Sequence, residues 1–206
     1  EQIKMALLEA DVNLRVVRRE ESRTKKLLDA ALDTVRKEHP DWNLEILHLM
    51  DLDLMYWKTE TLRERDELLA KKEYDAPVFK YGNQFREADG MIIAAPFWDL
   101  SVPAVLKVYI ENVSAEGITF GCNEEGLYGL CKAKWMLFLT TRGGIWADSD
   151  MEQGSTYMEA LCKFFGIDEY ACVYADGIDI QELDGEEILR EAIDETKTVC
   201  SRLCAE

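Results

Sequence analysis

An apolar run that ends in two aromatic residues is the segment of this chain best suited to holding a ligand. Residues 91–95 read Met-Ile-Ile-Ala-Ala, and Pro96, Phe97, Trp98 and Asp99 follow directly. A strand without polar alternation is buried on both faces, which is typical of a parallel sheet covered by helices. Ligands of such sheets bind beyond the carboxyl ends of the strands. The aromatic pair is therefore expected where a flat aromatic cofactor would be held.

A second apolar strand, predicted over residues 135–140, is followed by a turn that could also bind a ligand. Thr141, Arg142, Gly143 and Gly144 follow it. Glycines let backbone N–H groups approach a ligand closely, because no side chain stands in the way. The same four residues also suit an ordinary turn, so this motif supports a ligand site only in combination with the other segments.

A third segment, Ser22-Arg23-Thr24, opens a predicted amphipathic helix that ends near residues 39–40. The free N–H groups and the dipole at a helix start bind phosphate, and hydroxyl groups there add donors. Taken alone, the triplet also suits an ordinary helix cap followed by solvated basic residues. Together with the other two segments, it favours a phosphate site.

The elements that must position these segments alternate between strand and helix, which indicates βαβ crossovers and a doubly wound parallel sheet. Besides the segments above, strands are predicted at 44–49 and 172–174, and helices at 84–88 (as the end of a short helix), 103–113, 156–165 and 186–203. Pro103 is expected in the first turn of its helix. Residues 52–72 are charged and interrupted, and are interpreted as loop and helix together.

Composition narrows the class of protein. A chain of 206 residues suits one domain, and a net charge of −17 argues against binding nucleic acid or anionic membrane. Without an apolar stretch of membrane-spanning length or a signal-peptide pattern, a cytoplasmic location is expected. The six cysteines form no C-x-x-C pair, and only Cys200 and Cys204 share a helix face, so no metal site is expected. His39 and His48 are predicted to be peripheral, and no hydrolase-type constellation is present.

The motifs, in this order, resemble those of the FMN-dependent NADH-azoreductase and NAD(P)H quinone reductase family. The matching residues are Glu21-Ser22-Arg23-Thr24, Pro96-Phe97-Trp98-Asp99-Leu100, Ser101-Val102-Pro103, Leu106-Lys107, Gly117-Ile118-Thr119-Phe120 and Leu139-Thr140-Thr141-Arg142-Gly143-Gly144. They extend over most of the chain.

The resemblance implies a flavodoxin-like α/β fold: a doubly wound, five-stranded parallel sheet with helices on both faces, in one FMN-binding domain over residues 1–206. The residues that it implies for FMN are Ser22, Arg23, Thr24, Pro96, Phe97, Trp98, Asp99, Leu100, Thr141, Arg142, Gly143, Gly144 and Trp146. Relatives often have Asn at the position of Asp99 and His at that of Trp146. An ionised carboxylate cannot donate a hydrogen bond, so Asp99 is expected to act through its backbone.

The implied activity is that of an NAD(P)H oxidoreductase that reduces quinones or azo compounds by ping-pong transfer through the flavin. No catalytic side chain is expected, because hydride transfer to a flavin needs no general acid or base. The resemblance also implies a homodimer with the flavin near its interface, for which Tyr56 and Trp57 are candidate contacts. Residues 119–134 are expected to form a hairpin-like excursion near the flavin.

The opening segment departs from the family pattern. Residues 3–17 suit a helix as well as a strand, and resemble a helix of the signal-recognition-particle GTPase N domain. No G-x-x-x-x-G-K-[ST] loop follows, so a GTPase has no support. Either residues 4–10 or residues 12–17 must supply the first strand, and the first choice is favoured because it is more apolar. Residues 16–19, Val-Val-Arg-Arg, stand where small polar residues are expected. Two alternatives therefore stay open: a flavin-bearing electron carrier, and a relative of the same fold that no longer binds flavin.

Overall fold

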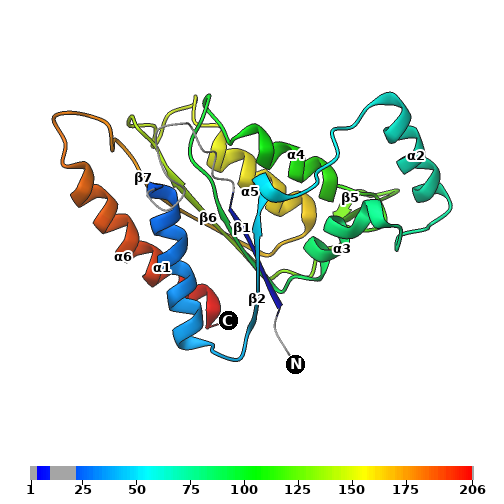
Figure 1. The fold of residues 1–206 in the computed structure, drawn as a ribbon, viewed down its shortest axis with the longest axis horizontal. Helices are drawn as coiled ribbons and strands as arrows, with labels where there is room; N and C mark the ends of the chain where they lie inside the picture. Colours follow the sequence, from blue (N-terminus) through cyan, green and yellow to red (C-terminus); the bar gives the residue numbers. More distant parts are fainter. Residues whose placement is uncertain (1–3, 10–21, 206) are drawn as a thin grey trace.

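The centre of the molecule is a parallel sheet, seen in the computed structural model, which describes residues 4–9 and 22–205 (Figure 1). Its strands are β1 (Lys4–Glu9), β2 (Asn43–His48), β3 (Gly90–Ala94), β6 (Trp135–Thr141) and β7 (Glu169–Ala175). Their order is β2-β1-β3-β6-β7, and every neighbouring pair is parallel. The order reverses between β1 and β3, and such a switch point is where ligands of open α/β sheets bind.

The first strand lies over Lys4–Glu9 and pairs with both β2 and β3. This is the favoured of the two positions that the sequence allowed. The alternative strand at 12–17 and the atypical residues 16–19 lie outside the described residues.

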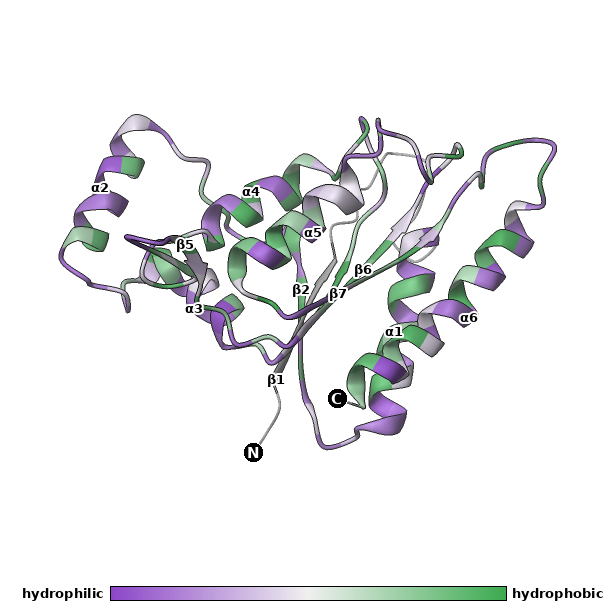
Figure 2. Cartoon of the chain, turned by 180° about the vertical axis from the view of Figure 1, so that it is seen from behind, coloured by the Kyte–Doolittle hydropathy of each residue, from purple (hydrophilic) through white to green (hydrophobic). Residues whose placement is uncertain are grey.

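Helices cover both faces of the sheet (Figures 1 and 2). On one face lie α1 (Arg23–Glu38) and α6 (Gly185–Cys204); on the other lie α3 (Lys80–Glu87), α4 (Ala104–Val113) and α5 (Gly154–Phe165). Each face has its own core of buried side chains, one built with α1 and α6 and the other with α3, α4 and α5. In Figure 2 the apolar sides of these helices turn toward the sheet, as the predicted periodicity requires. The flavodoxin-like α/β fold is thereby confirmed.

The two central strands follow from their apolar runs. All five residues of β3 are buried, and so are six of the seven residues of β6. The helices begin and end at the expected signals: Ser22 caps α1, and Gly166 ends α5 with a left-handed φ of 74°. One detail differs, because Pro103 is the N-cap of α4 and lies just outside its first turn. Among the described residues, no helix is both long and apolar enough to cross a membrane.

Residues 49–79 leave the sheet and carry three short elements. These are the 3-10 helix η2 (Leu49–Asp51), the helix α2 (Thr59–Ala70) and the 3-10 helix η3 (Pro77–Phe79). No residue of α2 is buried, and the helix projects from the body of the molecule (Figure 1). A segment without a buried stripe has no apolar periodicity, which is why the sequence did not separate loop from helix here.

The predicted excursion is a two-stranded hairpin of β4 (Phe120–Asn123) and β5 (Gly126–Gly129). The hairpin packs on the last turn of α5: the Phe120 and Phe164 ring centroids are 4.7 Å apart, and the Cys131 N–H donates to the Phe165 carbonyl at 3.2 Å. That turn leads into the start of β7, so the hairpin lies at the amino ends of the strands. Within one chain it is therefore remote from residues 96–100 and 141–144, and its expected place near the flavin stays a prediction.

Candidate functional site

Three segments that are distant in the sequence meet at the carboxyl edge of the sheet. The hydroxyl oxygens of Thr24, in the first turn of α1, and Thr141, at the end of β6, are 2.6 Å apart. Residues 96–100, which follow β3, are called the aromatic loop below. The Phe97 N–H donates to the Thr141 carbonyl at 3.1 Å, which fixes this loop beside the turn after β6. The parallel pairing of β3 with β6 brings these loops to the same edge. The structure thus brings together the start of α1, the aromatic loop and residues 141–144, which are called the glycine turn below.

The start of α1 carries a donor set that suits an anion. Its first turn has no acidic residue, and the Ser22 side chain accepts a 3.4 Å hydrogen bond from the Lys25 N–H. The half-exposed Arg23 guanidinium donates to Asp179 at 2.6 Å. Hydroxyl groups, a guanidinium and a helix N-terminus are the groups that bind phosphate. Asp179 would share Arg23 with any phosphate bound there.

The aromatic loop ends in a strained two-residue turn. Trp98 and Ser101 exchange N–H···O bonds of 2.9 and 2.8 Å, and the two residues between them have positive φ: 48° at Asp99 and 68° at Leu100. Left-handed backbone costs a non-glycine residue about 1–3 kcal/mol and clusters at ligand sites. The Gln153 N–H donates to the Leu100 carbonyl at 2.9 Å and holds the turn against the segment before α5.

Arg142 lies inside the protein, with its side chain only 2% exposed. Its guanidinium is 3.2 Å from the Glu152 carboxylate and 3.8 Å from that of Asp176. It also lies over the rings of Tyr174 and Phe97, at 4.5 and 5.5 Å from their centroids. The sequence nominated Arg142 for the cofactor. In the structure its side chain instead joins the aromatic loop, the end of β7 and the segment before α5, and only its backbone lies along the predicted turn.

The two carboxylates around Arg142 are the residues that sequence reasoning missed. Asp176 accepts hydrogen bonds from the Trp146 and Ala147 N–H groups at 2.8 and 2.7 Å. Glu152 accepts from the N–H groups of residues 154 and 155, both at 2.9 Å. Each carboxylate therefore fixes one loop and compensates the same buried cation. One signal was available: Asp176 follows closely on the strand predicted at 172–174, at the edge where ligands bind.

The glycine turn is closely covered on both sides. A Cβ atom added at Gly143 would lie 2.7 Å from the Asp179 carboxylate, and one at Gly144 would lie 3.1 Å from the Trp146 indole nitrogen. The Trp146 ring is in turn 5.5 Å from that of Phe97, tilted by 45°. A larger side chain at either position would crowd Asp179 or Trp146, so the close cover of this turn favours glycine. The Asp99 side chain suits a flavin less well than the Asn of relatives, because an ionised carboxylate can only accept a hydrogen bond.

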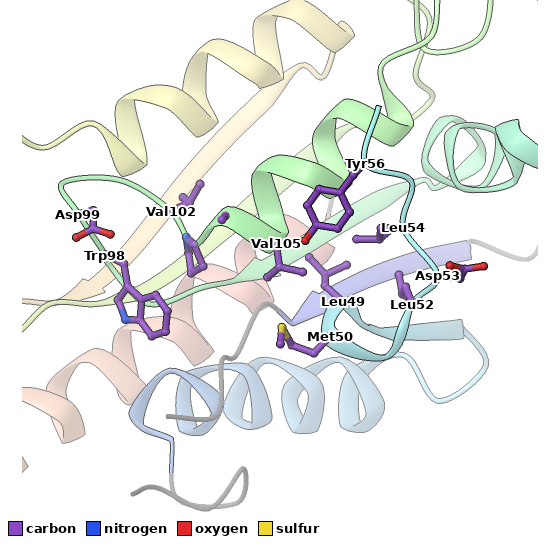
Figure 3. Close-up of a pocket in the computed structure, with 12 residues that line it drawn as sticks. Leu49, Met50, Leu52, Asp53, Leu54, Tyr56, Trp98, Asp99, Val102 and Val105 are labelled. Carbon is purple, nitrogen blue, oxygen red and sulfur yellow. The ribbon is translucent and has the colours of Figure 1, made fainter. Parts of the chain in front are cut away.

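An open apolar groove of about 550 Å³ adjoins the aromatic loop (Figure 3). One wall comes from residues 49–56, which follow β2, and the other from residues 98–105. Trp98 and Asp99 belong both to this groove and to the aromatic loop. The groove is thus continuous with the candidate site.

Five of the six cysteines are buried or half-buried. All six are free, and burial raises the pKa of the Cys131, Cys162 and Cys172 thiols to about 12. Cys200 and Cys204 are buried on α6. Within the described part of the chain, no three metal-ligating side chains lie together.

Sheet order, switch point and edge loops together define an α/β protein of the flavodoxin-like class. Residues 16–199 match the family model described as "Flavodoxin-like fold". The chain belongs to this family. Its relatives include FMN-dependent NADH:quinone oxidoreductases, as the resemblance implied.

Two relatives and one solved structure show the extent of the similarity. The chain is 35% identical over 179 residues to "FMN-dependent NADH:quinone oxidoreductase" of Clostridium beijerinckii, covering 85% of this chain and 89% of the relative. The identity and both coverages are the same for "FMN-dependent NADH:quinone oxidoreductase 2" of Clostridium acetobutylicum. The crystal structure of azoreductase from Bacillus anthracis str. Sterne superposes with a TM-score of 0.86 at 26% identity, covering 98% of this chain and 100% of that one.

Proposed function

We propose that this chain is an FMN-dependent NADH oxidoreductase that reduces quinones or azo compounds. The observation that carries the proposal is the meeting of three segments at one edge, through the Thr24–Thr141 and Phe97–Thr141 contacts. The names of the relatives support it, since they describe FMN-dependent NADH:quinone oxidoreductases and an azoreductase. In this proposal residues 1–206 are a single FMN-binding domain.

Each segment has one task. The phosphate would be held by Ser22, Arg23 and Thr24. The flavin ring would lie against residues 96–100, with its pyrimidine end toward the backbone N–H groups of residues 141–144. Trp146 would cover this turn. The donor set at α1 and the absence of side chains at Gly143 and Gly144 support this assignment. When bound, FMN supplies two-electron redox chemistry between NADH and the acceptor. Donor and acceptor then use one site in turn, which gives ping-pong kinetics.

The protein's own contribution is to bind, orient and exclude water. The Arg142 network holds the glycine turn and the aromatic loop in register, so little rearrangement is required when the ring binds. Phe97 and Trp146 lie against each other beside the turn and shield it from solvent. No side chain is assigned a proton-transfer role, so the rate is expected to vary little with pH near neutrality.

The assembly we propose is a homodimer. Its candidate contacts are the exposed side chains of Tyr56, which is 67% exposed at the rim of the groove, and of its neighbour Met55. Trp57 is a weaker candidate, because its indole N–H donates to the Glu111 carbonyl at 3.3 Å and Arg65 lies over its ring. Light scattering tests this point, and a monomer at micromolar concentration would refute it. A cytoplasmic location is part of the proposal, and the six free thiols agree with a reducing compartment.

The proposal is tested by the visible absorption spectrum of the purified protein with FMN, before and after anaerobic NADH. A bound flavin spectrum that bleaches within seconds, and recovers when a quinone is added, is the expected result. Binding without bleaching would indicate an electron carrier. A protein that leaves FMN free would be a relative of the same fold without flavin.

A further inference from the structure

We propose that the groove between residues 49–56 and 98–105 binds the apolar substituent of the electron acceptor and selects neutral acceptors over anionic ones. The inference rests on the proposed function and specifies its substrate class. The acceptors that fit are flat quinones or azo compounds that carry a second ring or an alkyl chain and no negative charge.

The shape of the groove supports an extended apolar ligand. Its volume of about 550 Å³ lies in the range that holds a ligand of drug size, and is far larger than one quinone ring requires. Half of its twelve lining residues have large non-aromatic apolar side chains: Leu49, Met50, Leu52, Leu54, Val102 and Val105. Leu49 is buried and forms part of the core beneath the groove, so this wall is held in place before a ligand arrives.

The position of the groove connects it to the reacting end of the ligand. Trp98 and Asp99 line it, and both belong to the strained turn of the aromatic loop. Figure 3 shows Trp98 at one end of the groove and Leu52 and Leu54 at the other. A flat acceptor placed against the aromatic loop would therefore extend its substituent along residues 49–54.

The charges of the groove determine which substituents it tolerates. Its described lining holds two carboxylates, Asp53 and Asp99, and no basic side chain. An anionic substituent would lose water beside two like charges, within a protein of net charge −17. Both carboxylates are exposed, so salt weakens the discrimination without abolishing it.

Two dyes that share one scaffold test the inference without any redox step. N-phenyl-1-naphthylamine is neutral, whereas 8-anilino-1-naphthalenesulfonate adds one sulfonate to the same ring system. Fluorescence titration of the full chain at low salt is expected to give a Kd at least tenfold lower for the neutral dye. The variant Asp53→Asn, on the wall formed by residues 49–56, is expected to tighten the sulfonate severalfold and to leave the neutral dye unchanged.

A substitution that fills the groove locates the binding site. Ala104 is exposed at the start of α4 and lines the groove, so Ala104→Trp adds bulk there without entering the core. We expect it to weaken the neutral dye at least tenfold. Ala160→Trp, on the exposed side of α5, is the matched control and should leave the Kd unchanged. Equal affinities for the two dyes, or neutral-dye binding that Ala104→Trp does not affect, would overturn the inference.

Two further measurements on the same samples separate the remaining outcomes. If light scattering shows a dimer that excludes the neutral dye and that Ala104→Trp dissociates, a second copy of the chain covers the groove and the inference is wrong. NADH bleaching of FMN is recorded in parallel. Normal bleaching without selective dye binding would contradict the inference about the groove alone. Selective dye binding without bleaching would contradict the proposed oxidoreductase activity.

Discussion

At the scale of single residues, Arg142 is the side chain on which the geometry of the candidate site depends. It is a buried cation between two carboxylates and two aromatic rings, and these partners come from the aromatic loop, β7, the residue after β7 and the segment before α5. A buried ion pair contributes little net stability compared with an apolar replacement, but removal of one partner leaves a charge without compensation. The arrangement therefore serves the placement of loops more than the stability of the core.

Removal of the Glu152 carboxylate tests this role. Glu152→Ala is expected to lower the free energy of unfolding by about 3–5 kcal/mol, because the guanidinium loses its nearest partner in a buried setting. FMN is expected to bind more weakly as well, since the adjacent turn loses its support. Urea unfolding and a flavin titration measure the two effects.

The matched control is Glu159→Ala on the same side of the sheet. Glu159 pairs with Lys163 at 2.6 Å on the exposed surface of α5, where such a pair is worth about 0–1 kcal/mol. If the two variants lose equal stability, Arg142 does not depend on Glu152.

The buried thiols give the protein an alkaline limit. Burial raises the pKa of the Cys131, Cys162 and Cys172 thiols from 9.0 to about 12. Between these values the unfolded chain loses thiol protons that the folded chain keeps, so stability falls as pH rises from about 9 toward 12. The slope is at most about 1.4 kcal/mol per pH unit for each thiol. Below pH 9 these groups contribute no pH dependence.

Urea unfolding at several pH values between 8 and 11 checks this expectation. Cys172→Ala should make the alkaline slope less steep, because two of the three thiols remain, whereas Cys122→Ala, at the exposed cysteine of the hairpin, should leave it unchanged. The same difference should appear in alkylation of the native protein at pH 8, where Cys122 reacts first. A slope that Cys172→Ala does not alter would contradict the assignment.

Sequence reasoning identified the segments of the site better than the tasks of their side chains. The contact between Thr24 and Thr141 joins two nominated motifs that are more than a hundred residues apart, and the parallel sheet order explains why they meet. Arg142 was nominated as a ligand-binding residue because its motif matched. Its burial depends on Glu152 and Asp176, which have no local pattern that links them to it.

At the scale of elements, the hairpin is fixed to α5 by a contact between two backbones. A Cβ atom at Gly129 would lie 2.0 Å from the Gly166 nitrogen and the Phe165 carbonyl carbon. Gly129→Ala must therefore separate β5 from the end of α5, and we expect a loss of about 3 kcal/mol in the free energy of unfolding. Thermal or urea unfolding measures the loss.

Gly126→Ala is the control within the same hairpin. Nothing lies within 4 Å of a Cβ added there, so only its positive φ of 123° is unfavourable, at about 1–2 kcal/mol. If Gly129→Ala were no worse than Gly126→Ala, the hairpin would not be held by this contact.

The elements that the sequence predicted well are those with an unbroken or strictly periodic apolar pattern. β3 and β6 were placed within one residue, and α1 was placed from its cap and its apolar side. β7 is longer than predicted, because most of its residues are only half-buried at the edge of the sheet. α2 buries no residue and offered no period to detect.

At the scale of the whole molecule, the dominant property is a net charge of −17. The proposed cofactor and the reductant NADH are both anions, so they approach against the field of the protein. Local donors at α1 hold the phosphate once it arrives, but the long-range field acts before any contact forms. The Debye length falls from about 30 Å at 0.01 M salt to about 8 Å at 0.15 M, so physiological salt removes most of this repulsion.

The rate of FMN association should therefore rise with salt, opposite to the behaviour of a protein that attracts its cofactor electrostatically. Between 0.01 and 0.15 M NaCl we expect an increase of roughly three- to tenfold in the second-order rate constant, measured by stopped-flow quenching of flavin fluorescence. Riboflavin lacks the phosphate and is neutral, so its association rate should hardly change and serves as the control. A rate for FMN that falls with salt while that of riboflavin stays constant would show that basic groups at the helix start, Arg23 foremost, govern the approach. The net charge would then act only on the solubility of the protein and on repulsion between its copies.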